Sequence, residues 1–180
     1  FFMLMSAAHG MVNNGSPWAC SGQNQGYRKS LYNRIGGFKK ISNQLQGDDT
    51  LFMLLCRKYG KAKFSFASPQ YNDKVFSRAE NTWISLIKQR IRWAGDMKIV
   101  YKYNIPFYSV SISTFFLNLF LILVPLFSIK LFLSALFLKF IFESNLFLLS
   151  KNLHAFNYPF SHFIFWFILQ IPFVVLVASL

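Results

Sequence analysis

Hydrophobic and polar positions divide the chain into a mixed first part and an apolar last part. Residues 1–104 alternate between short apolar groups and polar or basic stretches, whereas residues 105–180 are apolar almost throughout. An apolar run of about 20 residues is long enough to cross a bilayer as a helix. The pattern predicts three membrane-spanning helices, at residues 105–129, 131–149 and 158–180.

Shorter helices are predicted in the mixed part. Apolar residues recur at helical spacing after Asp48 and Asp49, either of which can cap the helix that they form, and Gly60 is placed to end it. Ser30 is a candidate helix cap, with Gly36 as the stop. The predicted helices cover residues 1–11, 31–35, 50–60 and 82–95.

Two short strands are also predicted. A strand is predicted over residues 61–67, because polar and apolar side chains alternate from Lys61 to Phe66, which is the period of a half-buried strand. A second strand is predicted over residues 74–77. Residues 1–104 are thus predicted to contain helices and two short strands, and the apolar helices follow them.

Charge is concentrated in the mixed part. The sequence holds 19 Lys and Arg against six Asp and Glu, and 16 of the basic residues fall in residues 1–104. A basic surface attracts nucleic acid, anionic lipid or phosphorylated substrates, and basic residues also flank membrane helices on the cytoplasmic side. The apolar content of 54% excludes an ordinary soluble domain.

One motif, at residues 89–93, lies inside the helix predicted over residues 82–95. Gln89, Arg92 and Trp93 occupy positions i, i+3 and i+4, so they project from one face. Arg can grip a diphosphate with two parallel hydrogen bonds, Trp can stack on a sugar ring, and Gln can bond a hydroxyl. This face is either a binding site or the polar side of an amphipathic helix that Trp anchors at a membrane surface.

Two further motifs carry candidate chemistry. Asp48 and Asp49 can supply a general base that deprotonates an acceptor hydroxyl, or they can simply cap a helix. The loop from Gly22 to Arg28 contains glycines and amide side chains, including that of Asn24. Such a loop suits a polyhydroxylated ligand, or it is a structural turn.

The order of these motifs resembles the family-2 glycosyltransferases. It is most similar to their membrane-bound, often processive type, such as cellulose, hyaluronan and poly-N-acetylglucosamine synthases. The resemblance implies the C-terminal part of a GT-A-like α/β nucleotide-sugar transferase domain in residues 1–104, and transmembrane helices in residues 105–180. The motifs that carry it are Gly22-x-Asn24-x-x-Tyr27-Arg28, Gly36-Gly37-Phe38, Gly47-Asp48-Asp49 and Gln89-x-x-Arg92-Trp93.

The resemblance implies a role for each matched residue. Asp49 corresponds to the catalytic base of the family, and Asp48 takes the place of a neighbouring Glu. Gly47 stands where some members have Thr, which leaves its role open. The Gln-x-x-Arg-Trp motif is the one expected to hold the donor diphosphate and the acceptor, and the glycine loop lies near the donor sugar. The residues expected to bind substrate are Asp48, Gln89, Arg92, Trp93, Gly22 and Asn24.

The resemblance also implies a divalent metal, Mg or Mn, held by an Asp-x-Asp motif. No Asp-x-Asp occurs in this sequence. Cys20 and Cys56 have no metal-ligand spacing, and neither have His154 and His162. We therefore expect the chain to be a fragment that lacks the metal ligands and does not catalyse transfer alone.

The implied activity is transfer of a hexose or hexosamine from a nucleotide-diphospho-sugar to a saccharide or lipid hydroxyl, with inversion, in polysaccharide biosynthesis. A non-processive transferase that acts on a lipid carrier is one alternative. A non-catalytic membrane protein with a basic lipid-binding face is another. We expect no nucleic-acid partner.

Charges near the apolar runs bear on topology. Lys98 and Lys102 precede the first predicted span, which places residues 1–104 on the cytoplasmic side of a multi-pass protein of the cell membrane. Lys139 and Glu143 lie at positions i and i+4 inside the second predicted span. They either line a polar path or pair with each other, because an unpaired charge is costly in a bilayer.

Overall fold

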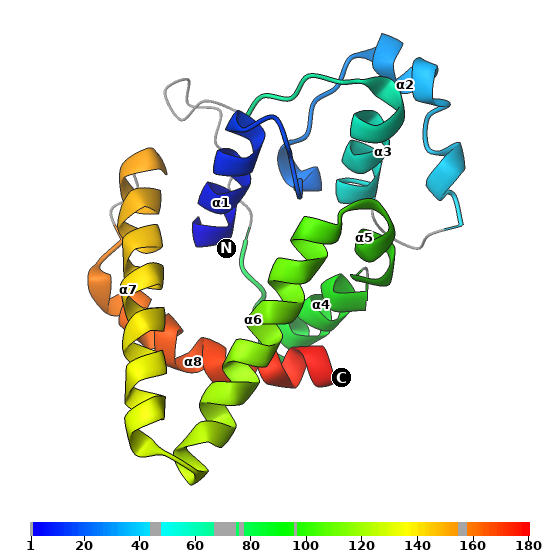
Figure 1. Ribbon diagram of the computed structural model, residues 1–180. Helices are drawn as coiled ribbons and strands as arrows, with labels where there is room; N and C mark the ends of the chain where they lie inside the picture. The colour runs from blue at the N-terminus through cyan, green and yellow to red at the C-terminus, as the bar shows by residue number, and fades with distance from the viewer. Residues whose placement is uncertain (1, 44–47, 67–74, 76–77, 96, 155–157) are drawn as a thin grey trace. The chain divides into compact units, whose positions relative to one another are not determined.

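The computed structural model describes residues 2–43, 48–66, 75, 78–95, 97–154 and 158–180, and none of these residues lies in a strand (Figure 1). The regular structure of the described residues consists of α-helices and short 3-10 helices, which loops connect. The elements are α1 (Phe2–Asn13), η1 (Gly22–Asn24), α2 (Lys29–Ile35), η2 (Lys39–Ile41), α3 (Thr50–Gly60), α4 (Trp83–Gly95), α5 (Met97–Tyr103), α6 (Ile105–Leu123), η4 (Val124–Leu126), α7 (Ile129–His154) and α8 (Phe160–Ser179).

The chain divides into two compact units, and each is described by itself. Unit 1 consists of Phe1–Ser6, Glu80–Gly95 and Pro106–Leu180, and it holds α4, α7, α8 and nearly all of α6. Unit 2 consists of Ala7–Ala79 and Asp96–Ile105, and it holds α2, α3 and α5.

The centre of unit 2 is α3, which confirms the helix predicted after Asp49. The Asp49 side chain caps the helix by accepting a hydrogen bond from the Thr50 amide. Residues 51–56 are all buried, so this helix is enclosed by its own unit rather than amphipathic. The helix ends at Gly60, and Lys61 follows in the left-handed conformation at φ 46°.

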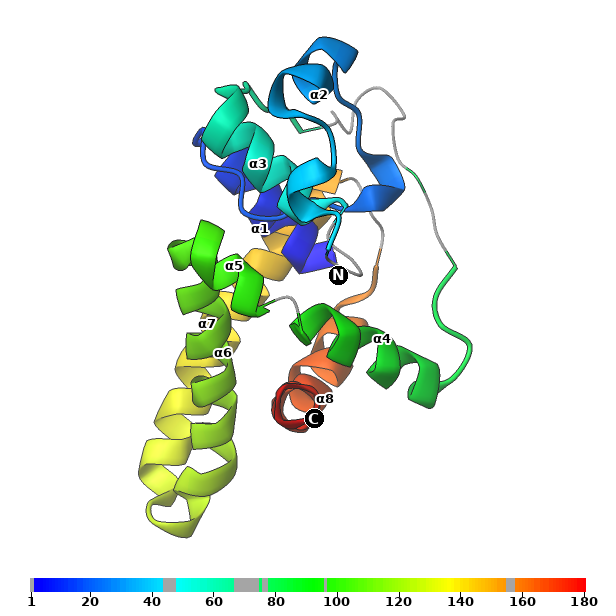
Figure 2. The same cartoon turned by 90° about the vertical axis from the view of Figure 1, so that its right-hand side faces the viewer.

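Helix α2 packs against α3, and both views of the chain show them side by side (Figures 1 and 2). The stop at Gly36 is confirmed, because this residue has φ 83° and closes the helix. The predicted cap is wrong: Arg28 takes the cap position, without a side-chain cap, and Ser30 lies inside the first turn. An aromatic cluster of Tyr27, Tyr32, Phe38 and Phe52 fills the space between the two helices.

The strand predicted over residues 61–67 is wrong for residues 61–66, which have no regular structure. Their side chains do alternate between exposed and half-buried, as the pattern predicts. A strand also requires hydrogen bonds to a neighbouring strand, and the described residues provide none. The second predicted strand lies mostly outside the described residues, as does Gly47.

Unit 1 contains the three apolar helical segments. Ile105–Leu126, Ile129–Leu153 and Phe160–Ser179 are each long and apolar enough to cross a membrane. Figure 1 shows α6 and α7 meeting at the turn around η4, from which they diverge. Large apolar side chains of these segments are exposed, for example Leu126 at 79% and Phe142 at 72%. Contact of this apolar surface with water would be unfavourable, whereas contact with lipid costs little free energy.

The contact between α7 and α8 is built from phenylalanines. Phe163 and Phe167 of α8 meet Phe140 and Phe147 of α7, with ring centroids 5.3 to 5.8 Å apart for the pairs Phe140–Phe163, Phe140–Phe167 and Phe147–Phe163. Aromatic pairs at these distances add stabilisation beyond simple area burial. Helix α4 also packs against α8 (Figure 2).

Candidate functional site

Asp49 and the glycine loop lie together in unit 2. The Gly22 amide donates a hydrogen bond of 3.1 Å to Oδ2 of Asp49, while the Thr50 amide donates to Oδ1. Each carboxylate oxygen therefore accepts one backbone N–H, and the charge sits at the positive end of α3. Asp48, the neighbouring acid, is exposed. The sequence predicted both motifs but gave no indication that they contact each other.

Thr50 fastens the same loop to α3. Its hydroxyl donates to the Cys20 carbonyl at 3.0 Å and accepts from the Cys20 amide at 3.2 Å. From further along the loop, the Gln25 side chain donates to the Asp49 carbonyl at 3.4 Å. Thr50 and Gln25 are not among the residues predicted from the sequence; the position of Thr50, next to the acid pair, is the one signal that could have indicated it.

Gly22 and Asn24 occupy an exposed stretch of this loop, the 3-10 turn η1. A Cβ at Gly22 would lie 3.5 Å from Cβ of Asp49, which is an ordinary contact. Gly22 is therefore not required by its distance from Asp49. Its amide is still essential to the arrangement, because it donates the hydrogen bond that orients the carboxylate.

The Cys20 thiol lies beside this acid. Burial of the thiol, together with the negative charge of Asp49, raises its pKa from 9.0 to about 11. A thiol with so high a pKa stays protonated at neutral pH and is a poor nucleophile. Cys20 is therefore a packing residue of the loop.

The Gln-x-x-Arg-Trp motif lies on α4 in unit 1, in the helix that the sequence predicted. Thr82 caps α4: its hydroxyl accepts a hydrogen bond from the Ser85 amide at 3.1 Å, and the Thr82 amide donates back to the Ser85 hydroxyl at 3.3 Å. Trp83, the first residue of α4, is 57% exposed.

Two contacts hold the motif side chains. Gln89 donates a hydrogen bond of 2.8 Å to Glu80. The Arg90 guanidinium lies 4.3 Å from the ring centre of Trp93, and burial lowers the pKa of this arginine. Arg92 and Trp93 are exposed. Arg90 thus stacks on the indole, whereas Arg92 is exposed. The spacing of the motif residues does not show this difference between the two arginines.

The candidate residues therefore form two groups. Asp48, Asp49, Gly22 and Asn24 belong to unit 2, whereas the Gln-x-x-Arg-Trp residues belong to unit 1. Across the residues that the structure describes, no group of three or more His, Cys, Asp and Glu is placed to hold a metal ion.

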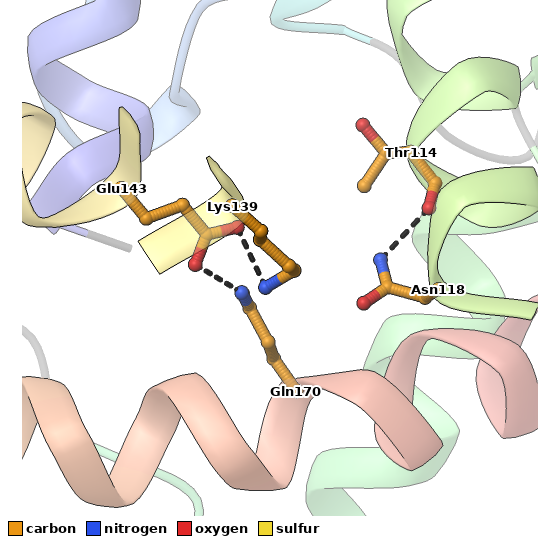
Figure 3. A network of polar contacts seen from close by, with 5 residues as sticks. All are labelled: Thr114, Asn118, Lys139, Glu143 and Gln170. Carbon is orange, nitrogen blue, oxygen red and sulfur yellow. Dashed lines mark hydrogen bonds and ion pairs between the residues drawn. The ribbon is translucent and has the colours of Figure 1, made fainter. Parts of the chain in front are cut away.

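A separate polar cluster lies among the apolar helices of unit 1 (Figure 3). Lys139 and Glu143 of α7 form an ion pair with an N–O distance of 2.8 Å, and Gln170 of α8 donates a hydrogen bond to the same carboxylate. The Lys139 ammonium also lies 4.5 Å from the ring centre of Phe167. The pairing predicted from the i, i+4 spacing is present, and Gln170 is the partner that the sequence analysis missed.

Asn118 of α6 faces the same polar region (Figure 3). Its side-chain amide donates to the Thr114 carbonyl at 2.8 Å, and its Oδ1 atom is buried with no hydrogen-bond partner among the described residues. Polar side chains of α6, α7 and α8 thus gather at one place among these apolar helices (Figure 3).

Comparison with known proteins assigns the class. A sequence profile described as "Glycosyl transferase family group 2" matches residues 2–178. The chain therefore belongs to the glycosyl transferase family group 2, whose members use a nucleotide-sugar donor and an acceptor. No curated protein and no solved structure matched the chain. The match takes in both groups of candidate residues and all three helices that are long enough to span a membrane.

Proposed function

We propose that the chain carries the acceptor side of an inverting, membrane-bound glycosyltransferase that moves a hexose or hexosamine from a nucleotide diphosphate to a saccharide or lipid hydroxyl. The observation that supports this most is the family match over residues 2–178, which includes Asp49 and the Gln-x-x-Arg-Trp helix. The membrane-bound synthases of polysaccharides are the proposed subclass, because apolar helices follow the motif directly.

Asp49 is the proposed general base. An ionised carboxylate has about four lone-pair positions, and in Asp49 two of them accept backbone N–H groups. The remaining positions are available to an acceptor hydroxyl, and the two amides hold the carboxylate in one orientation. Asp48 is exposed beside it and is proposed to contact substrate.

Helix α4 is the proposed binding element for the donor diphosphate and the acceptor sugar. Arg92 is exposed and suits a diphosphate, which it can bind through two parallel hydrogen bonds. Trp93 is 39% exposed, with Arg90 against its ring, so its free area suits stacking on a sugar. Gln89 would exchange its bond to Glu80 for a substrate hydroxyl.

The divalent metal that the family resemblance implies does not fit the residues that the structure describes. No described cluster has the ligands for it, and both oxygens of Asp49 already accept backbone amides. No step is therefore assigned to a metal in this chain. We propose that the metal ligands, and the strands of a GT-A-like α/β core, belong to other segments of the enzyme. This polypeptide alone is then inactive, which an assay with nucleotide sugars tests directly.

The basic residues before α6 support a cytoplasmic position for residues 1–104 in the cell membrane, because positive loops stay on that side. Nucleotide sugars are present on the same side. Protease access to these residues in sealed inverted vesicles, but not in intact cells, would be the expected result.

The deciding experiment is Asp49→Asn in the full-length membrane enzyme. Asn caps a helix about as well as Asp, so the fold should persist while the base is lost. We expect turnover to fall about 100-fold or more, as is usual for loss of a general base, with donor binding unchanged. Asp48→Asn, at the acid proposed to contact substrate, should weaken substrate binding but leave turnover at saturating substrate largely intact. Normal turnover in Asp49→Asn would remove Asp49 from the role of base.

A second experiment, which measures product length on a defined primer, separates a processive synthase from a non-processive lipid-carrier transferase. A processive synthase makes long products on a defined primer, whereas a lipid-carrier transferase adds one sugar. Replacing Gln89 with Ala should lower transfer in either case. If Gln89→Ala changed no activity, the exposed face of α4 would be a membrane anchor only.

A further inference from the structure

Three lysines and two tyrosines form a ladder on unit 2 that the proposed transfer reaction does not use. Lys40 lies 3.7 Å from the ring centre of Tyr59, and Lys58 lies 5.4 Å from that ring and 5.4 Å from the ring of Tyr103. Lys102 completes the series at 5.9 Å from Tyr103. The ladder therefore alternates cation and ring across η2, the last turns of α3, and α5.

The fold holds the ladder together through Arg57. Its guanidinium donates to the Pro17 carbonyl at 3.0 Å and to the Tyr103 carbonyl at 3.1 Å. The buried Asn104 side chain donates to the Trp18 carbonyl at 3.3 Å, which fixes the end of α5. The lysines are thus brought together by buried backbone contacts, although their charges repel each other.

No described carboxylate of unit 2 neutralises these charges. The acids that the structure describes in this unit are Asp48 and Asp49, at the opposite end of α3. Lys58 comes nine positions after Asp49, which is about 13 Å along a helix. This distance exceeds the Debye length of about 8 Å at physiological salt. Cation–π contacts offset part of the repulsion, and an external anion would offset the rest.

The position of the ladder in the chain indicates which anion. Tyr103 comes two residues before Ile105, where the first helix that can span a membrane begins. Lys102 comes three residues before that start, so along the chain it is close to the head-group layer, which is about 5–7 Å thick in each leaflet. The contact between Lys58 and Tyr103 keeps Lys58 and Tyr59 close to this part of the chain. Tyrosine beside lysine is also the composition typical of a membrane interface.

We propose that Lys40, Lys58, Lys102, Tyr59 and Tyr103 form a binding surface for the phosphate head groups of anionic phospholipid. The tyrosine rings lie at the interface, and the ammonium groups contact the phosphates. This surface holds α3, and with it the Asp49 end of that helix, at a fixed height above the bilayer. It goes beyond sugar transfer and does not depend on it.

The test compares the reconstituted full-length protein in nanodiscs of neutral phosphatidylcholine with nanodiscs that also contain phosphatidylglycerol. Hydrogen exchange is followed at the amides of α5 and the last turn of α3. A lysine near an anionic surface strengthens association about fivefold, so phosphatidylglycerol should slow exchange by at least about fivefold. In about 1 M salt, where the Debye length is about 3 Å, the effect should disappear. Equal exchange in both lipids would overturn the proposal without any variant.

Two variants of equal charge sharpen the comparison. Lys40→Gln/Lys58→Gln/Lys102→Gln should lose the lipid effect. Lys29→Gln/Lys63→Gln/Arg78→Gln removes three exposed charges of unit 2 outside the ladder and should keep it. Loss of the effect in both variants would indicate general attraction by net charge and would contradict a defined surface. Equal protection by a single-stranded RNA in neutral nanodiscs would indicate a nucleic-acid surface instead.

Discussion

The Gly22 amide donates its hydrogen bond to Oδ2 of Asp49 across 27 residues of sequence. Through this bond the glycine loop and the acid pair become one structure at the start of α3. The same carboxylate caps that helix through Thr50. Asp49 thus has a structural role that any test of its chemistry must keep separate.

Two substitutions distinguish the structural role of Asp49, as helix cap and acceptor for Gly22, from its proposed role as base. Asp49→Ala removes the cap and the acceptor for Gly22, and loss of a cap costs about 1–2 kcal/mol. We expect the amides of Gly22 and Thr50 to exchange about tenfold faster, since 1.4 kcal/mol is a factor of ten. Asp49→Asn should change exchange much less, because its amide oxygen still caps the helix. Hydrogen exchange measured on both variants checks this, and equal acceleration in the two would show that the carboxylate charge, not the cap, holds the loop.

The pKa of Cys20 predicts slow alkylation. A pKa of about 11 instead of 9.0 makes the thiolate about 100-fold rarer at pH 8. In a Cys56→Ser background, the rate with a small alkylating reagent should rise tenfold per pH unit and still be rising at pH 10. Asp49→Asn should shift this profile to lower pH, because it removes one cause of the raised pKa. A rate that levels off near pH 9 in the folded protein would contradict the prediction.

The same pKa has a consequence for stability. Above pH 9 the unfolded thiol loses its proton while the folded one keeps it, so the folded state binds more protons. Stability from this group is therefore full below pH 9 and falls as the pH rises from 9 to 11. Cys20→Ala should flatten the loss of stability across that interval, as measured by thermal unfolding.

The sequence was a good guide where a local pattern decides the structure. An acidic cap at the start of α3, the stop at Gly36, α4 and the three apolar helices follow from composition and spacing within one segment. Residues 61–66 show the limit of that reasoning, since their alternation is real but the described residues supply no partner strand. Whether a strand forms depends on a distant segment, which the local pattern does not encode.

The candidate site was predictable as residues but not as contacts. Gly22 and Asp49, or Glu143 and Gln170, are 27 residues apart in each case, and their pairing depends on how helices pack. Arg90 occupies an unspecified position of the Gln-x-x-Arg-Trp motif, yet its guanidinium lies over the Trp93 ring. Only the packed chain shows which polar groups satisfy one another.

Three glycines provide a graded test of the fold around α2. A Cβ at Gly37 would lie 2.6 Å from the Tyr32 ring, and its φ is 61°. Gly36 has φ 83° but open space, whereas Gly26 has open space and an ordinary φ. We expect Gly26→Ala to be neutral, Gly36→Ala to cost about 1 kcal/mol and Gly37→Ala to cost about 2–3 kcal/mol. Thermal unfolding of the reconstituted protein ranks the three, and a neutral Gly37→Ala would show that Tyr32 moves freely.

The ion pair between Lys139 and Glu143 should matter more than either charge alone. The Lys139 side chain is only 2% exposed, and that of Glu143 is 24% exposed. Glu143→Gln leaves a buried ammonium without its counter-charge, which costs about 3 kcal/mol in a membrane helix. Lys139→Met leaves the carboxylate with its bond from Gln170 and should cost less.

The double variant Lys139→Met/Glu143→Leu decides between a pair and two independent charges. Removing both partners of a buried pair is often nearly neutral, because no uncompensated charge remains. We therefore expect the double variant to recover most of the stability lost in Glu143→Gln, as followed by unfolding of the reconstituted protein in increasing detergent. Lys130→Met, at an exposed position near the start of α7, is the control and should change stability by less than about 0.5 kcal/mol. A double variant no more stable than Glu143→Gln would mean that these charges bind something other than each other, and Asn118, with its unpaired oxygen facing the same region, would be the next residue to replace.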